Sequence, residues 1–451
     1  MKLYIKLFSL FLITGILSAC KPNLDIPEPS AGDANFIKSI AIGGDYMAGY
    51  QDGALFHDGQ ERGIPALLAR QFTLTGNCQF NQVILSDNSG LGWNSKPWES
   101  WFVQASRLNY RFDCEGTRSL GPVKDSLSRN TASMLFSNYY FPVNSNFAIP
   151  FARTADLFSP AFGANPGMNN ANPYYFRIAS SPGTSTVIGD AQNVHPTFVS
   201  AWLGMEDIYE YARHGGEGTT IMSPALFSNY LDSVFTRLLI QEAKGCIANI
   251  PDFRSFPYYT LVPWNGAELT ASKADSLTAI YETAGLTHIV FHEGKNGFII
   301  NDAAAPSGVR QLHAGEYLTL SIPLDSMKCD FLGILFNVLP GQYVLDSSEV
   351  AFIDQMTASY NAIIAQKAQQ YGLAFVDANS YFKNVEAGIK WNGVDFNTKF
   401  VTGGFYSLDG YHPNQNGYAL ITNQFIKAIN LRFNATVPTL NCTDCNGVLF
   451  P

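Results

Sequence analysis

Acidic residues and one histidine stand at three separate places where they could take part in chemistry. Asp45 follows a glycine pair, Glu206 directly precedes another acid, and Asp409 and His412 lie three positions apart near the C-terminus. Carboxylates and an imidazole are suitable ligands for a divalent cation. Two of the carboxylates could also serve as the acid and base of a glycosidase. Both alternatives require that the fold bring these side chains together.

The elements that must position these residues are short apolar runs that alternate with helical patterns. This alternation predicts a parallel sheet whose strands are connected by helices. The expected strands are residues 39–43, 146–149, 197–203, 246–250 and 373–377. In such a sheet, ligands bind beyond the carboxyl ends of the strands. We expect the segments with Asp45, Glu206 and His412 to meet at that edge.

Two helices are clearly indicated. Asp346 and Glu349 have the spacing of a capping box, and Gly372 ends the apolar pattern that follows. A second helix is expected after His412-Pro413, with an apolar face. That face consists of Tyr418, Ile421, Phe425 and Ile429. Residues 75–140 and 254–340 are rich in turn formers, so we expect them to be insertions in one large α/β domain.

The composition favours a folded protein that does not bind nucleic acid. Hydrophobic residues make up 46% of the 451 residues and charged residues only 14%, which argues against extensive disorder. The net charge of −9 argues against nucleic acid as a partner. We expect a signal peptide at residues 1–19, a lipid anchor and tether at 20–35, one domain at 36–433 and a C-terminal tail at 434–451.

The N-terminus has the pattern of a lipoprotein signal. Lys2 and Lys6 flank the start of an apolar run that is too short to span a bilayer. The run ends in Leu17-Ser18-Ala19-Cys20, which resembles the bacterial lipobox, in which the cysteine is lipidated. We therefore expect Cys20 to anchor the protein to a membrane of the cell envelope, with the outer membrane or cell surface as the expected location.

Export permits disulfides among the six cysteines after Cys20. The pair Cys442 and Cys445 lacks the second pair that a structural zinc site would need, so a local disulfide is expected there. Cys246 lies in an apolar run and is expected to be a buried thiol. A pairing of Cys78 with Cys114 is possible, but the sequence does not decide it.

Several segments together resemble the SGNH/GDSL hydrolases, specifically the large lipoprotein members found in Bacteroidetes. The resemblance spans about residues 36–433 and includes "AGYQDG", "NPYYFRIASSP", "GCIANIPD", "SIPLDSMKC" and "SLDGYHPNQNGYALITNQFIKAIN". It implies a three-layer α/β/α sandwich around a parallel sheet of about five strands, flavodoxin-like in strand order.

The resemblance also implies a role for each site residue. Asp45 stands where the family has its nucleophilic serine, Phe151 where it has an oxyanion glycine, and Glu206 where it has an oxyanion asparagine. Asp409 and His412 match the family's orienting carboxylate and base. An alternative match that places Tyr46 at the serine requires a gap.

These substitutions predict the loss of ordinary serine-esterase activity, because acyl transfer needs a nucleophile, a base and donors to the oxyanion. A non-catalytic ligand-binding or structural lipoprotein is the favoured interpretation, with a glycan, an acyl ester or another small molecule as ligand. One alternative is an active hydrolase of ester-linked acyl or acetyl-glycan substrates that uses Asp45, His412 and Asp409. Another is a divalent-metal site built from Asp45, Glu206, Asp409 and His412. No other cofactor is expected.

Overall fold

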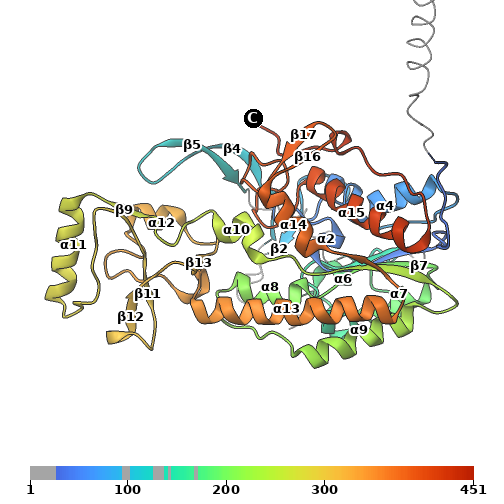
Figure 1. The fold of residues 1–451 in the computed structure, drawn as a ribbon, viewed down its shortest axis with the longest axis horizontal. Coiled ribbons are helices and arrows are strands. Elements are labelled where there is room, and N and C mark those ends of the chain that lie inside the picture. The colour runs from blue at the N-terminus through green and yellow to red at the C-terminus, as the bar shows by residue number, and fades with distance from the viewer. Residues whose placement is uncertain (1–26, 94–101, 125–136, 141–143, 167–170) are drawn as a thin grey trace, which may run out of the picture.

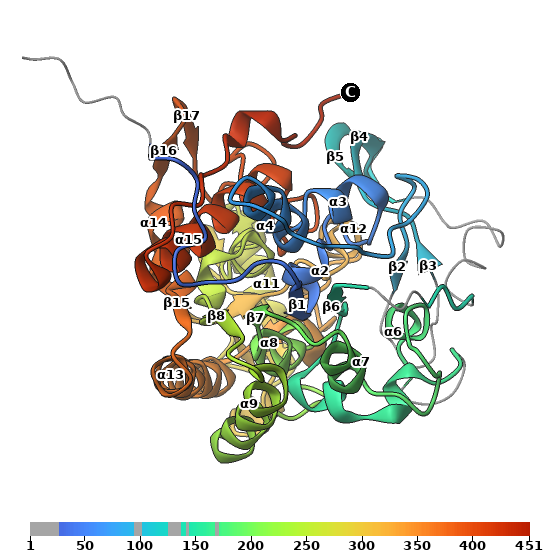
Figure 2. The same ribbon diagram turned by 90° about the vertical axis from the view of Figure 1, so that its right-hand side faces the viewer.

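The central element is a parallel sheet of five strands in the order β15-β8-β7-β1-β6, which Figure 2 shows at 90° to the view of Figure 1. The computed structural model describes residues 27–93, 102–124, 137–140, 144–166 and 171–451. The strands are β1 (Ser39–Gly43), β6 (Asn146–Ala148), β7 (Phe198–Trp202), β8 (Lys244–Ala248) and β15 (Ala374–Val376). Numbered along the chain, this is the order 2-1-3-4-5 of flavodoxin-like folds. The expected fold class and all five expected strands are confirmed.

Helices cover both faces of this sheet, which gives three layers (Figure 2). On one face lie α4 (Ile64–Thr73) and α15 (Gln415–Phe433). The other face is covered by α7 (Val187–Asn193), α8 (Met205–Arg213), α9 (Pro224–Leu238) and α13 (Ser347–Gln370). The central strands are therefore hidden on both sides, and every residue of β1 and β7 is buried. This is why their sequences read as continuous apolar runs rather than as alternating ones.

The two helices indicated by the sequence are present. Asp346 accepts hydrogen bonds from the backbone of Ser348 and Glu349, and the Glu349 side chain accepts one from the Asp346 backbone, which completes the capping box of α13. Gly372 follows this helix with a φ of 63°. The four apolar residues expected on one face of α15 are all buried. Asn414 caps this helix by accepting from the Gly417 N–H at 3.0 Å.

The turn-rich segments add a hairpin and a lobe to this framework (Figure 1). The hairpin pairs β4 (Arg107–Phe112) with β5 (Arg118–Val123). The lobe contains α10 (Pro257–Thr260), β9 (Ala267–Leu269), α11 (Ala271–Thr283), β10 (Gly294–Asn296), β11 (Ile299–Asn301), β12 (Val309–Gln311), β13 (Tyr317–Leu318), α12 (Leu324–Cys329) and β14 (Val344–Leu345). Two small hydrophobic clusters of its own stabilise the lobe.

Short elements connect these parts. They are α2 (Asp45–Ala48), α3 (His57–Glu61), β2 (Gly92–Trp93), β3 (Phe102–Val103), α6 (Pro173–Phe176), α14 (Ala378–Ala387), β16 (Ile389–Trp391) and β17 (Val394–Phe396). After α15 the C-terminal residues return along this helix, where the Leu440 N–H donates to Asn423 Oδ1 at 2.7 Å.

The cysteine pairing corrects the expected local bond between Cys442 and Cys445 and settles the partner of Cys114, which the sequence left undecided. Cys114 in the hairpin is bonded to Cys329 at the end of α12, and Cys78, Cys442 and Cys445 are free thiols. The bonded pair is separated by 215 positions, so only the docking of the hairpin against the lobe brings the two residues together. Cys442 is buried near Asn392, with its Sγ 3.5 Å from the Asn392 side-chain oxygen. The expectation of a buried Cys246 thiol is confirmed.

The expected signal peptide and Cys20 lie outside the described residues. Within the part of the chain that the structure describes, none of the helices has the length and apolar character needed to cross a bilayer.

Candidate functional site

Three chain segments converge beyond the carboxyl edge of the sheet, as the fold class predicts. Asp45 is the first residue of α2, directly after β1, and Glu206 lies in the first turn of α8, after β7. His412 lies on the turn that precedes α15. The Asp207 side chain fixes a fourth segment there, because its Oδ2 accepts from the N–H of Thr154 at 3.0 Å and from its hydroxyl at 2.6 Å.

Asp409 holds the imidazole of His412 in place. Its Oδ2 is 2.8 Å from His412 Nδ1, and its Oδ1 accepts the backbone N–H groups of Tyr411 and His412. The Gly53 N–H also donates to Oδ2, at 2.8 Å. Burial opposes ionisation of Asp409, but the positive charge of His412 and these hydrogen bonds hold its pKa below the ordinary value. Asp409 is therefore an anion that orients His412 and stabilises its charged form.

Both carboxylate oxygens of Asp45 are engaged, one by a backbone N–H and the other by the imidazole of His412. Its Oδ1 accepts the Phe151 backbone N–H at 2.5 Å, and its Oδ2 is 3.1 Å from His412 Nε2. Burial opposes ionisation of Asp45, but the hydrogen bond and charge of His412, with help from Arg213, hold its pKa below the ordinary value. The side chain of Asp45 has no exposed surface.

Burial likewise opposes protonation of His412, but the Asp409 and Asp45 carboxylates outweigh it and raise the pKa of His412 to about 9. The imidazole is therefore a cation near neutral pH, with one carboxylate at each ring nitrogen. In this state it has no lone pair with which to accept a proton from a nucleophile.

Arg213, at the end of α8, completes the centre and was not expected from the sequence. One guanidinium nitrogen lies 3.6 Å from Asp45 Oδ2, and another bonds Glu206 at 2.6 Å and Glu210 at 2.9 Å. Burial works against its charge, but these acids hold the pKa of Arg213 well above its ordinary value. The only sequence signal was the i, i+4, i+7 spacing of Glu206, Glu210 and Arg213, which places them on one helix face.

Glu206 faces the arginine rather than a position where it could donate to a substrate oxygen. Burial raises the pKa of Glu206 to about 8, while Arg213 acts in the opposite direction. Its second oxygen, Oε1, is buried and has no hydrogen-bond partner among the described residues. A cavity of about 10 Å³ beside Asp45 and Glu206 has room for about one water molecule.

Phe151 keeps a glycine-like backbone although it carries a large side chain. Its φ is 64°, the left-handed region in which a bulky residue is uncommon and costs of order 1–3 kcal/mol. This conformation directs its N–H to Asp45. The aromatic ring packs edge-on against Tyr50 and lies 5.8 Å below the Arg213 guanidinium. Phe151 therefore supplies a backbone donor and also helps to cover the centre.

Tyr46 is directed elsewhere. Its hydroxyl donates to the Tyr411 carbonyl at 2.6 Å, and its ring packs edge-on against Trp202. Asp45, and not Tyr46, lies opposite the Nε2 atom of His412.

The centre does not fit a divalent cation. Among the described residues, the one group of three with metal-ligand spacing is His57, Asp58 and Glu61 on α3, which includes none of the acids of the centre. The carboxylates of Asp45 and Glu206 are instead bridged by the guanidinium of Arg213. A fixed cation already neutralises these acids and would repel a metal ion.

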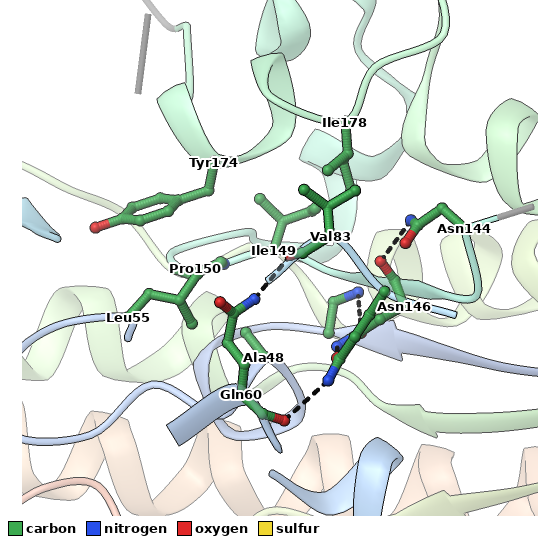
Figure 3. Close-up of a pocket in the computed structure, with 12 residues that line it drawn as sticks. Ala48, Leu55, Gln60, Val83, Asn144, Asn146, Ile149, Pro150, Tyr174 and Ile178 are labelled. Atoms are coloured by element: carbon green, nitrogen blue, oxygen red, sulfur yellow. Dashed lines mark hydrogen bonds between the residues drawn. The ribbon is translucent and has the colours of Figure 1, made fainter. Parts of the chain in front are cut away.

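Two cavities beside the centre are far smaller than a substrate. The cavity on the β6 side measures about 30 Å³ and lies between α2 and the segment before Phe151 (Figure 3). Gln60 crosses it to donate to the Val83 carbonyl at 3.0 Å, and Asn146 donates to Gln82 at 3.0 Å. This space has room for one or two water molecules. It is too small for an acyl group together with its alcohol.

Comparisons with known proteins give similarity to solved structures only, and at low TM-scores. No protein-family profile and no curated protein matches it. An alpha/beta hydrolase enzyme from the metagenome of Lake Arreo is similar with a TM-score of 0.35 and 11% identity, covering 88% of this chain and 96% of that one. A protein described as a GDSL-like lipase from Parabacteroides merdae gives 0.35 and 9%, with coverage of 89% and 100%. An extracellular lipase from Streptomyces rimosus gives 0.33 and 13%, with coverage of 88% and 99%.

Proposed function

We propose that this chain is a non-catalytic homologue of the SGNH/GDSL hydrolases, retained as a ligand-binding or structural lipoprotein of the cell envelope. The observation that carries the proposal is the position of Asp45, whose carboxylate engages both the Phe151 N–H and His412 Nε2. In the family's chemistry, the first group would stabilise the oxyanion and the second would activate the nucleophile.

Each requirement of acyl transfer is unmet in this arrangement. The base is protonated and paired, and the oxyanion donor is already accepted by a carboxylate. Glu206 turns to the Arg213 guanidinium instead of presenting the fixed amide donor that an asparagine would supply. The loss of one oxyanion donor typically costs about 3–4 kcal/mol of transition-state stabilisation, so the combined loss reduces the rate to background.

The alternative of Asp45 as a covalent nucleophile has less support. A nucleophilic carboxylate needs a free lone pair aimed at an open substrate site. Asp45 is fully buried, and its oxygens are taken up by Phe151, His412 and Arg213. The metal-dependent alternative also has less support, because the positive charge of Arg213 already neutralises Asp45 and Glu206.

The proposed location depends on the N-terminal sequence alone. Lys2, Lys6 and the stretch that ends in Cys20 form a lipoprotein signal, followed by a polar, proline-containing tether. Replacing Cys20→Ser is expected to release the protein from the membrane fraction or to stop its maturation. Unchanged membrane partitioning of this variant would contradict the anchor.

Ester hydrolysis tests the proposed loss of catalysis. Purified wild type should hydrolyse p-nitrophenyl acetate no faster than its His412→Ala variant, because the imidazole is not available as a base. A His57→Ala variant, which changes an unrelated histidine on α3, serves as a matched control. A clear burst or steady turnover that disappears only in His412→Ala would support the active-hydrolase alternative instead.

A further inference from the structure

A second site lies away from the closed centre. A cleft of about 450 Å³ is formed by the start of the β4–β5 hairpin, α3, the N-terminus of α15 and residues 446–451. Its lining includes Asp52 and Leu408 but none of the residues Asp45, Glu206, Arg213 and His412. This volume is in the range of small-molecule sites and corresponds to roughly one or two sugar rings.

Two buried polar groups in the wall of this cleft lack partners. Gln51 is 2% exposed and Ser106 is 6% exposed, and both line the cleft. The Nε2 of Gln51 and the Oγ of Ser106 make no hydrogen bond within the described chain. An unsatisfied buried polar group costs about 1–3 kcal/mol. A ligand with hydroxyl groups has the donors and acceptors that such atoms lack.

The rest of the lining selects the chemical class of that ligand. The charged side chains are Asp52, Asp58 and Arg107, so there is no excess of positive charge to attract a phosphate or a carboxylate. Burial raises the pKa of Asp52 to about 7, which further reduces the charge near neutral pH. The cleft therefore disfavours anions.

The polar groups are mainly side-chain amides, which both donate and accept as sugar hydroxyls do. They are Gln51, Asn88, Asn109, Asn414, Gln415 and Asn446. Phe56, Leu108 and Leu408 add apolar surface that fits the C–H faces of a sugar ring.

The C-terminal residues form one wall of the cleft and are loosely held. The Asn446 N–H donates to Gln415 at 3.3 Å, whereas the structure gives no hydrogen bond to residues 447–451 in the described chain. Leu449 and Phe450 are 74% and 60% exposed. These residues can therefore move to fit a ligand while breaking few contacts.

From these observations we propose that the cleft lined by Gln51 and Ser106 binds an uncharged carbohydrate of one or a few sugar units. The inference deepens the proposed ligand-binding role but uses a different part of the molecule. Ester hydrolysis at His412 and saccharide binding at this cleft can therefore succeed or fail separately.

Isothermal titration calorimetry on the full mature protein in detergent provides the test. The probes are maltose, cellobiose and N,N′-diacetylchitobiose, with digalacturonic acid as the anionic comparison and trialanine as the peptide comparison. At least one neutral disaccharide should bind, and the two comparison ligands should not. Binding of trialanine or digalacturonic acid without binding of any neutral saccharide would overturn the assignment, as would the absence of binding by all five probes.

Two substitutions in the cleft wall test whether the saccharide binds there. Ser106→Ala and Gln51→Met remove the unpartnered groups, so each should weaken saccharide binding by about fivefold, the value of one neutral hydrogen bond. Neither should lower the melting temperature, since neither group has a partner in the free protein. Ser276→Ala on α11 and Gln355→Met on α13, both exposed, are the matched controls. Equal affinities for the wild type and both cleft variants would place the sugar elsewhere and overturn the proposal.

Discussion

The guanidinium of Arg213 lies 2.6 Å from Glu206 and 3.6 Å from Asp45, and so joins two buried carboxylates. In the proposed family match, Glu206 stands at the oxyanion position and Asp45 at the nucleophile position. Two acids placed together in a buried site repel each other unless one is protonated or a cation intervenes. In this chain the cation is a side chain of the same helix as Glu206. The charged residues of the centre therefore form one mutually compensated group.

Removal of the arginine should destabilise the fold strongly. Arg213→Met leaves Asp45 and Glu206 buried without their cation, and breaking a buried pair in this way typically costs about 3–5 kcal/mol. Chemical denaturation measures the free energy of unfolding. Arg237→Met on α9, which removes an exposed arginine, should cost far less. Adding Asp45→Asn and Glu206→Gln to the Arg213→Met chain should restore much of the loss, and no restoration would argue against a coupled network.

Glu206 should make stability depend on pH in a particular direction. Burial raises its pKa from an ordinary 4.5 to about 8, so between these values the folded state binds a proton that the unfolded state has released. Stability contributed by this group is therefore lost as the pH rises from 4.5 to 8. Thermal unfolding across this range should show a smaller decline in Glu206→Gln than in the wild type. Parallel curves for the two proteins would mean that Glu206 is ionised throughout.

Thiol labelling tests the cysteine assignment. Under denaturing conditions without reductant, iodoacetamide should alkylate Cys78, Cys246, Cys442 and Cys445, which are free thiols in the structure. Cys114 and Cys329 should react only after reduction. Peptide mass spectrometry reads the result. A crosslinked peptide that joins Cys442 to Cys445 would contradict it.

Much of the fold could be predicted because its signals are local. Apolar runs located all five strands, and the Asp346–Glu349 capping box located the start of α13, since each depends on neighbouring residues. The convergence of Asp45, Glu206 and His412 also followed, because parallel strands present their carboxyl ends at one edge.

The missed features depend on distant contacts. Arg213 matters only because α8 turns its acidic face towards Asp45, which no local pattern encodes. The Cys114–Cys329 bond depends on how the hairpin docks against the lobe. The left-handed backbone of Phe151 was hidden because a phenylalanine does not signal the conformation that a glycine would.

The charge state of His412 tests the central claim most directly, because a base paired with Asp45 cannot be free for catalysis. In protein labelled with ¹⁵N-histidine, NMR should show the His412 imidazole titrating with a pKa of about 9. Asp45→Asn should lower that pKa, because it removes a carboxylate 3.1 Å from Nε2, whereas Asp395→Asn, at an exposed acid, should leave it unchanged. A His412 that titrates near 6.5 in the wild type and does not respond to Asp45→Asn would contradict the closed centre.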